Sequence, residues 1–210
     1  NKRKDHTATS ERSHIMKKKT PTLAFDLARD VRAVGAMAAN LTPYLYEKEL
    51  YGYLSGELPR LTVGGLLMRL YRLSRLSNHL SAEQQNTVQD AAINLEAEQS
   101  EWGVHYEAKI QQELEARINA LTRFLEECRE GNSTCAANYP IEAEKRVIIE
   151  HLRREAAELN VLPPELDTRL HQLDNQLRRL LTEGPFITDP MLEEVYPRDE
   201  FWWLYGFIAG

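Results

Sequence analysis

A stretch of about 50 residues, from Ala82 to Glu130, contains no proline and repeats apolar side chains at the spacing of a helix. Intervals of three or four residues place such side chains on one side of a 3.6-residue turn, so helix is predicted. The apolar face consists of Val88, Ala92, Leu95, Trp102, Tyr106, Ile110, Leu114, Ile118, Leu121, Leu125 and Cys128. A continuous helix of this length would measure about 75 Å, and Gly103 is the one place where a bend or break is expected.

Three shorter helices are expected before the long one. Thr20-Pro21 and Thr42-Pro43 each combine a capping hydroxyl with a proline at the first helical position, where no N–H is needed. Thr62 is the expected cap of the third helix, and Ser81 with Gln84 has the form of a capping box at the start of the long one. The apolar spacing predicts these short helices over about 21–40, 43–55 and 62–80.

Two helices are predicted to return along the long one. The first follows the loop REGNSTCAANYP and is expected to be capped by Asn138. The second has a regular heptad pattern that stops at Gly184-Pro185, with Leu166, Leu170, Leu173, Leu177 and Leu180 at intervals of 4, 3, 4 and 3. Stretches with period-2 alternation are too short to predict a strand. The expected fold is all-α: an elongated helical bundle, or antiparallel coiled-coil-like hairpin, built on one long central helix.

Four regions follow from this pattern. They are 1–15, a vector-derived tag or disordered basic tail ahead of Met16; 16–80, short helices; 81–184, the long helix with its returning pair; and 185–210, an aromatic segment packing on the bundle. A narrow leucine seam buries little surface per residue, so a second copy of the chain is a natural way to cover the remainder. A homodimer is therefore expected, with higher assemblies left open.

Charge is distributed unevenly along the chain. Residues 1–19 hold seven lysines and arginines against two acidic residues, while the other 191 residues hold 19 basic and 30 acidic side chains. A body this acidic repels a phosphate backbone, so a nucleic-acid partner is not favoured. The alternative of a nucleic-acid-associated regulator would use an arginine-rich helix face and a lysine run: Arg60, Arg69, Arg72, Arg75 and Lys17–Lys19.

The chain has two cysteines, Cys128 and Cys135, without a C-x-x-C motif or a second pair that could complete a zinc site. The longest apolar stretch is far below the roughly 20 residues that span a bilayer, and nothing near the start resembles a secretory signal. A cytoplasmic location is therefore expected, and free thiols are favoured over a disulfide or redox switch. The glycosylation-type tripeptide Asn132-Ser133-Thr134 is given no weight in that setting.

Gly64 and Gly65 fall in the first turn of the third helix, near Arg60 and Arg69. Free N–H groups at a helix start, with guanidinium groups nearby, can hold a phosphate or carboxylate. These four residues are the candidate anion-binding site. Close packing of helices explains the two glycines more simply, because one glycine pair lacks the spacing of a phosphate-binding loop.

Several acidic and histidine residues invite a metal-site interpretation: Glu98, Glu101, His105, His151 and Glu155. A di-iron bundle needs Glu and His three residues apart on two helices, whereas here they are four apart, so surface ion pairing is favoured. The sequence also lacks a nucleophile-elbow motif and a glycine-rich loop after a strand. No catalytic, cofactor-binding or metal-binding residue is predicted, no cofactor is expected, and the chain is expected not to be an enzyme.

The end of the chain, RDEFWWLYGFIAG, is strongly aromatic. A short helix there would place Phe201, Leu204, Tyr205 and Ile208 on one face and leave the other aromatic side chains off it. Packing in the protein's own core or a dimer core is favoured over docking of another protein, and docking over contact with a membrane interface. The candidate docking residues are Trp202, Trp203, Tyr205 and Phe207, because tryptophan and tyrosine dominate binding hot spots.

These patterns predict a non-catalytic helical scaffold or adaptor that self-associates and mediates protein–protein interaction, with the aromatic segment as the candidate docking site for a partner. Two alternatives stay open: the nucleic-acid-associated regulator, and an anion- or phosphate-binding protein at the helix start of Gly64 and Gly65.

Overall fold

The computed structural model describes residues 24–209 and confirms an all-α protein over that range. The predicted tail 1–15, the lysine run and the cap at Thr20-Pro21 lie outside the described residues. The helices are α1 (Leu27–Ala39), α2 (Leu41–Tyr46), α3 (Val63–Arg75), α4 (Ala82–Glu101), α5 (Gly103–Arg129), α6 (Cys135–Glu158) and α7 (Pro164–Leu180). Short elements are the 3-10 turns η1 (Ser77–His79), η2 (Pro190–Leu192) and η3 (Trp202–Leu204), and the strands β1 (Leu181–Glu183) and β2 (Gly206–Ile208).

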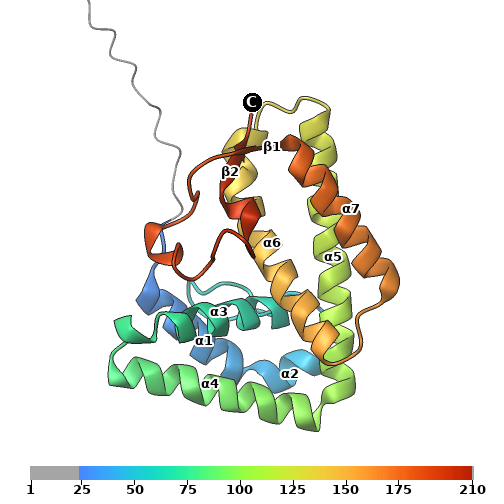
Figure 1. Ribbon diagram of the computed structural model, residues 1–210. Helices are drawn as coiled ribbons and strands as arrows, with labels where there is room; N and C mark the ends of the chain where they lie inside the picture. The colour runs from blue at the N-terminus through green and yellow to red at the C-terminus, as the bar shows by residue number, and fades with distance from the viewer. Residues whose placement is uncertain (1–23, 210) are drawn as a thin grey trace, which may run out of the picture.

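The stretch predicted as one long helix is divided at Trp102 into α4 and α5. Trp102 leaves the helical region, with φ −118° and ψ 32°, and α5 begins at Gly103. Figure 1 shows the two helices at a steep angle to each other. The break expected at Gly103 is therefore confirmed, and a continuous central rod is wrong.

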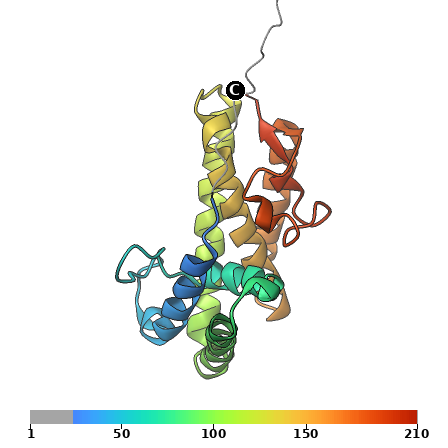
Figure 2. The same cartoon turned by 90° about the vertical axis from the view of Figure 1, so that its left-hand side faces the viewer.

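The helices form two groups that share α5. Helices α5, α6 and α7 run side by side, up, down and up, while α1, α3 and α4 cross the lower end of this bundle (Figures 1 and 2). Helix α7 folds back beside α5 and does not continue the line of α6. The predicted leucine seam of α7 is buried at Leu166, Leu170, Leu173 and Leu177.

The helix predicted over 43–55 is only the six-residue α2, and a loop follows it up to Thr62. The loop departs from helix because distant groups bind its carbonyls. The Lys109 Nζ donates to the carbonyls of Glu47 and Glu49 at 2.8 and 2.6 Å, and the Tyr44 hydroxyl donates to the carbonyl of Leu50. These bonds stabilise extended and turn backbone where the apolar spacing alone indicates a helix.

The predicted helix starts have mixed outcomes. Thr62 accepts a hydrogen bond from the Gly65 N–H, and the capping box of Ser81 and Gln84 is present, so both are confirmed. The α6 helix begins at Cys135, three residues before the predicted cap Asn138, which is therefore wrong.

The predicted cap Thr42 is wrong as well. Helix α2 begins at Leu41 after Asn40, and the Thr42 hydroxyl donates to Glu98 instead of to a helix start.

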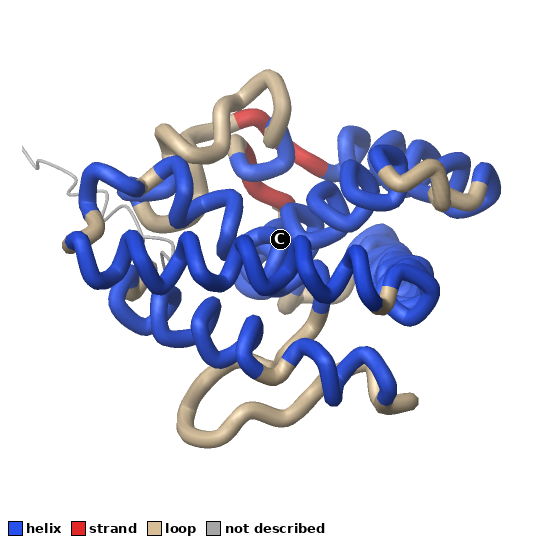
Figure 3. The backbone as a smooth tube through the Cα atoms, turned by 90° about the horizontal axis from the view of Figure 1, so that it is seen from below, coloured by secondary structure: helices blue, strands red, loops and turns tan. Residues whose placement is uncertain are grey.

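The end of the chain is not the short helix that its spacing suggests. It forms the single turn η3 and then β2, which pairs antiparallel with β1 in the register Leu181–Ile208, Thr182–Phe207 and Glu183–Gly206. The expectation of no strand is therefore wrong at these two short elements, drawn in red in Figure 3. The C-terminal segment, residues 181–209, packs along α6 through η3 and β2.

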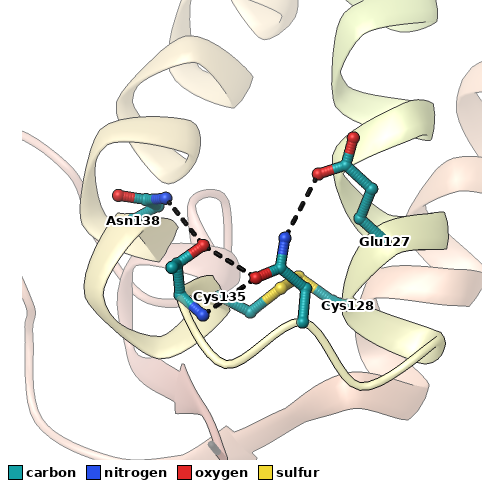
Figure 4. The surroundings of a disulfide bond; sticks show 6 residues. Glu127, Cys128, Cys135 and Asn138 are labelled. Carbon is teal, nitrogen blue, oxygen red and sulfur yellow. Dashed lines mark hydrogen bonds between the residues drawn. A yellow bond between two sulfur atoms is a disulfide. The ribbon is translucent and has the colours of Figure 1, made fainter.

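Cys128 and Cys135 form a disulfide, so the prediction of free thiols is wrong. The antiparallel return of α6 along α5 brings the last turn of α5 beside the first turn of α6, which places the two cysteines together (Figure 4). Over residues 24–209, none of the helices combines the length and apolar character needed to cross a bilayer.

Candidate functional site

A pocket of about 240 Å³ lies where α1, α3 and α6 meet the C-terminal segment. Its floor is charged and buried, and its walls are largely apolar. Exposed Ala24, Asp26 and Arg29 mark its open side. The apolar walls include Phe25, Ala33, Val147, Leu192 and Leu204.

Buried charges form the floor of the pocket. Asp30, 5% exposed, accepts two hydrogen bonds from Arg72, Nε to Oδ2 and Nη2 to Oδ1, each at 2.5 Å. The Arg69 Nε lies 3.0 Å from the same Oδ1, and Glu144 is 3.3 Å from Arg72 Nη1. Both oxygens of Asp30 are thus committed to arginines, so this carboxylate holds the α1–α3 contact together.

The pKa values of the two arginines respond to this arrangement in opposite ways. Burial by itself would lower the pKa of Arg72, but the hydrogen bonds and charge of Asp30 raise it above its ordinary value. Burial lowers the pKa of Arg69, and the charge of neighbouring Arg72 acts in the same direction. Arg69 is therefore the less fully compensated cation of the pair, and it faces the pocket.

Two hydroxyl groups in the pocket wall have no hydrogen-bond partner among the described residues: Thr188 Oγ1 and Tyr196 Oη. Thr188 is 8% exposed and Tyr196 is 3% exposed. Burial raises the pKa of Tyr196 against the opposing effect of nearby Arg72, so the hydroxyl stays protonated and able to donate. An unpaired buried hydroxyl is costly, about 1–3 kcal/mol, and these two groups have hydrogen-bonding capacity left for a molecule in the pocket.

The candidate anion site at the start of α3 is taken by the protein's own carboxylate. The Gly64 N–H donates to Glu113 Oε2 at 2.8 Å, and Arg117 Nε donates to Glu113 Oε1 at 2.7 Å. A side chain on Gly64 would meet Ile148 at 2.6 Å, which agrees with the close-packing interpretation. Gly65 donates to the Thr62 hydroxyl.

The four candidate anion-binding residues are not brought into one open site. Gly64 and Gly65 are buried at the α3 start, while Arg60 is exposed and lies over the Tyr53 ring at 5.3 Å. Arg69 alone of the four lines the pocket.

The four candidate docking residues divide by burial. Trp203 and Tyr205 are 1% and 6% exposed, Trp202 is half-buried, and Phe207 is 47% exposed. The Tyr139 hydroxyl donates to the Trp203 carbonyl at 2.6 Å, which ties the segment to α6. The burial of Trp203 and Tyr205 is what packing in the protein's own core requires. The exposed aromatic surface of this segment is provided by Trp202 and Phe207.

The acidic residues considered for a metal site make ordinary hydrogen bonds. Glu155 Oε1 accepts from the Tyr106 hydroxyl at 2.9 Å, and Glu98 accepts from the Thr42 hydroxyl at 2.6 Å. From Ala24 to Ala209, no group of three or more His, Cys, Asp or Glu side chains is arranged to hold a metal ion.

His151 lies on α6 in an aromatic cluster and is 7% exposed. Its ring centroid is 4.7 Å from that of Tyr71 and 6.2 Å from that of Phe201. Burial lowers the pKa of His151 from 6.5 to about 4, with the charge of Arg154 acting in the same direction and that of Glu150 opposing it. His151 is therefore neutral in the folded protein at pH 7.

This depressed pKa predicts a loss of stability in mild acid. Between pH 6.5 and 4 the unfolded chain binds a proton at His151 that the folded chain excludes, so the free energy of unfolding falls as the pH drops. The fall between pH 7 and pH 4 is expected to be about 3 kcal/mol. When the free energy of unfolding is measured with urea across this pH range, it should depend less on pH in His151→Phe than in the unmodified chain.

The control is His171→Gln, at an exposed histidine, which should keep the full pH dependence. An equal pH dependence in His151→Phe and the unmodified chain would contradict the prediction.

Three of the pocket residues missed by the sequence pattern are Asp30, Thr188 and Tyr196. Asp30 had a signal, because it interrupts the apolar face of the first helix while arginines follow on another helix. Thr188 and Tyr196 had none, because the segment around them has neither helical nor strand periodicity.

Comparisons with protein-family models, with curated proteins and with solved structures found no match for this chain. Function is therefore inferred from the geometry of the pocket alone.

Proposed function

We propose that this chain is a non-catalytic binding protein whose pocket takes a small carboxylate-bearing molecule. The observation that carries the proposal is that two hydroxyls, of Thr188 and Tyr196, have no hydrogen-bond partner within residues 24–209 and lie in the wall of a 240 Å³ pocket beside Arg69. Binding sites of small molecules are mostly apolar pockets with a few convergent polar groups, and this pocket has that composition.

The free polar groups favour an anionic ligand. Both oxygens of Asp30 already accept from Arg72 or contact Arg69, so its carboxylate has little capacity left for a ligand donor. The two hydroxyls can donate, and Arg69 has one nitrogen, Nη2, beyond Nε, which lies 3.0 Å from Asp30, and Nη1, which donates to the Gly65 carbonyl. A carboxylate could accept from all three groups, while a short hydrocarbon part would lie against the apolar walls.

The scaffold and adaptor hypothesis, the homodimer and the non-enzymatic character stay predictions. Burial of Trp203 and Tyr205 leaves less aromatic surface for a protein partner. Arg69 and Arg72 are committed to Asp30, which reduces the arginine face that a nucleic-acid regulator would use. These observations favour the small-ligand proposal over both alternatives.

The proposal is tested by thermal shift with acetate, hexanoate, benzoate and glutarate. At least one is expected to raise the melting temperature of the unmodified chain in a concentration-dependent way, because a ligand that binds only the folded state stabilises it. Two controls should have no such effect: neutral benzamide, and sodium chloride at the ionic strength of the carboxylate salts. Tyr196→Phe and Thr188→Val should each weaken the affinity about tenfold, since each removes a hydrogen bond to a charged group.

The same variants distinguish a ligand site from a structural one. Without ligand, Tyr196→Phe and Thr188→Val should melt no lower than the unmodified chain, because they remove hydroxyls that have no partner among the described residues. The matched control Tyr139→Phe loses a hydroxyl that donates at 2.6 Å, so it should melt lower yet bind the carboxylate normally. The proposal fails if no carboxylate exceeds sodium chloride, or if both pocket variants bind as well as the unmodified chain.

A further inference from the structure

The turn between α5 and α6 presents an exposed asparagine in an acceptor sequence. Gly131 has φ +89°, and the Asn132 N–H donates to the Glu127 carbonyl, which ends α5 in a left-handed turn. The tripeptide Asn132-Ser133-Thr134 has the N-x-S/T form, without proline in the middle, and all three residues are exposed. The turn lies at the end of the bundle, in the short loop that the disulfide closes (Figure 4).

The side chains of this tripeptide are arranged around the amide of Asn132. Its Oδ1 accepts from the Thr134 N–H at 3.0 Å and from the Thr134 hydroxyl at 2.9 Å. Its Nδ2 has a single long contact, 3.5 Å to Glu127 Oε2. N-linked glycosylation uses Nδ2, which is therefore on an exposed side chain. The amide oxygen of that side chain is held by the threonine of the motif.

The disulfide on the same loop points to the compartment in which that reaction occurs. Disulfides form and persist in oxidising compartments, among them the lumen of the endoplasmic reticulum, and are rare in the cytosol. Cys128 and Cys135 are paired, which argues against the cytoplasmic location expected from the sequence. The disulfide is an observation independent of the acceptor motif, and both indicate a secretory environment.

A second tripeptide of the same form, Asn40-Leu41-Thr42, can be compared with the one at Asn132. Leu41 is 0% exposed, Asn40 Nδ2 donates to the Ala36 carbonyl at 2.8 Å, and the Thr42 hydroxyl donates to Glu98. The Asn40 amide nitrogen thus bonds to the end of α1, and the Thr42 hydroxyl joins α2 to α4. Both asparagines are exposed, but the amide nitrogen of Asn132 is the less strongly hydrogen-bonded of the two, at 3.5 Å against 2.8 Å.

We propose that Asn132 is an N-glycan acceptor. In this reaction Nδ2 attacks the anomeric carbon of an oligosaccharide carried on a polyprenyl pyrophosphate. The new carbon–nitrogen bond forms as the carbon–oxygen bond to the pyrophosphate breaks. The amide nitrogen gives one proton to a base of the transferase, the lipid pyrophosphate leaves, and no electrons are exchanged with a redox partner.

The test is a peptide map of the chain isolated from its own cells, with free thiols blocked by alkylation at lysis. The expected result is a Cys128–Cys135 disulfide peptide in which peptide N-glycosidase converts a glycosylated Asn132 to aspartate. Unmodified Asn132 throughout the population, or alkylation of both cysteines, would overturn the proposal. A glycan confined to Asn40 would overturn it as well.

Variants of the full chain, directed into the secretory pathway of cultured eukaryotic cells, give the second arm. Asn132→Gln and Thr134→Ala should lose the glycosidase-sensitive mass shift, while Thr134→Ser and the control Asn40→Gln should retain it. Cell-associated and secreted material are both examined, so a variant that fails to leave the cell is still scored. Absence of the shift from the unmodified chain in both fractions would reject Asn132 as an acceptor.

Discussion

Replacing Trp203 with alanine is expected to lower the free energy of unfolding by about 3–5 kcal/mol, the range for truncating a buried large aromatic side chain. Trp203 is 1% exposed, its ring lies 5.5 Å from that of Phe201, and Arg146 lies over it at 4.2 Å. Alanine cannot fill this volume, and the cavity would remain between α6 and the C-terminal segment. Urea unfolding followed by far-ultraviolet circular dichroism measures the change without relying on tryptophan emission.

The matched control is Phe207→Ala on the same segment. Phe207 is 47% exposed, so its truncation should cost about 1 kcal/mol. A similar small loss for Trp203→Ala would contradict the assignment of the aromatic segment to the core, and would return Trp203 to the candidates for partner docking.

Asp30→Asn is expected to destabilise the protein by about 3–5 kcal/mol, because it leaves the buried guanidinium groups of Arg69 and Arg72 without their shared counter-charge. Within residues 24–209, Glu144 is the remaining carboxylate at ion-pair distance from Arg72, and its side chain is 41% exposed. Asparagine keeps the shape of the side chain, so the loss measures charge more than packing.

Two further variants make the Asp30 experiment decisive. Asp90→Asn changes an exposed aspartate on α4 and should alter stability by no more than about 0.5 kcal/mol. Adding Arg69→Met to Asp30→Asn should recover part of the loss, because one uncompensated cation is removed with its partner. Equal behaviour of Asp30→Asn and Asp90→Asn, or additive losses in the double variant, would show that the buried ion cluster does not hold α1 to α3.

Local signals in the sequence succeeded where a residue's partner lies within a few positions. The cap at Thr62 and the capping box at Ser81 and Gln84 were predictable because their hydrogen bonds join residues three apart. The bend near Gly103 was predictable because glycine weakens a helix at its own position. The helix over 43–55 failed, because the carbonyls of Glu47 and Glu49 bind Lys109, about 60 residues further along the chain.

The candidate site depended still more on distant contacts. Arg69 was identified from its place near a helix start, yet its partner is Asp30 on α1 and not an external anion. The anion position at Gly64 was real, but an internal carboxylate, Glu113, occupies it. A helix pattern indicates which groups a terminus can bind and does not show which residue of another helix will arrive there.

By itself, the sequence determined the all-α class, the helix starts at Thr62 and Ser81 and the burial of the leucine seam, because caps and apolar periodicity act over one or two turns. Only the tertiary structure decided the rest. The return of α6 along α5 paired Cys128 with Cys135, and the docking of the C-terminal segment closed the pocket around Tyr196. The physical reason is that each of these features joins elements whose relative position is set by packing, which no local pattern of residues specifies.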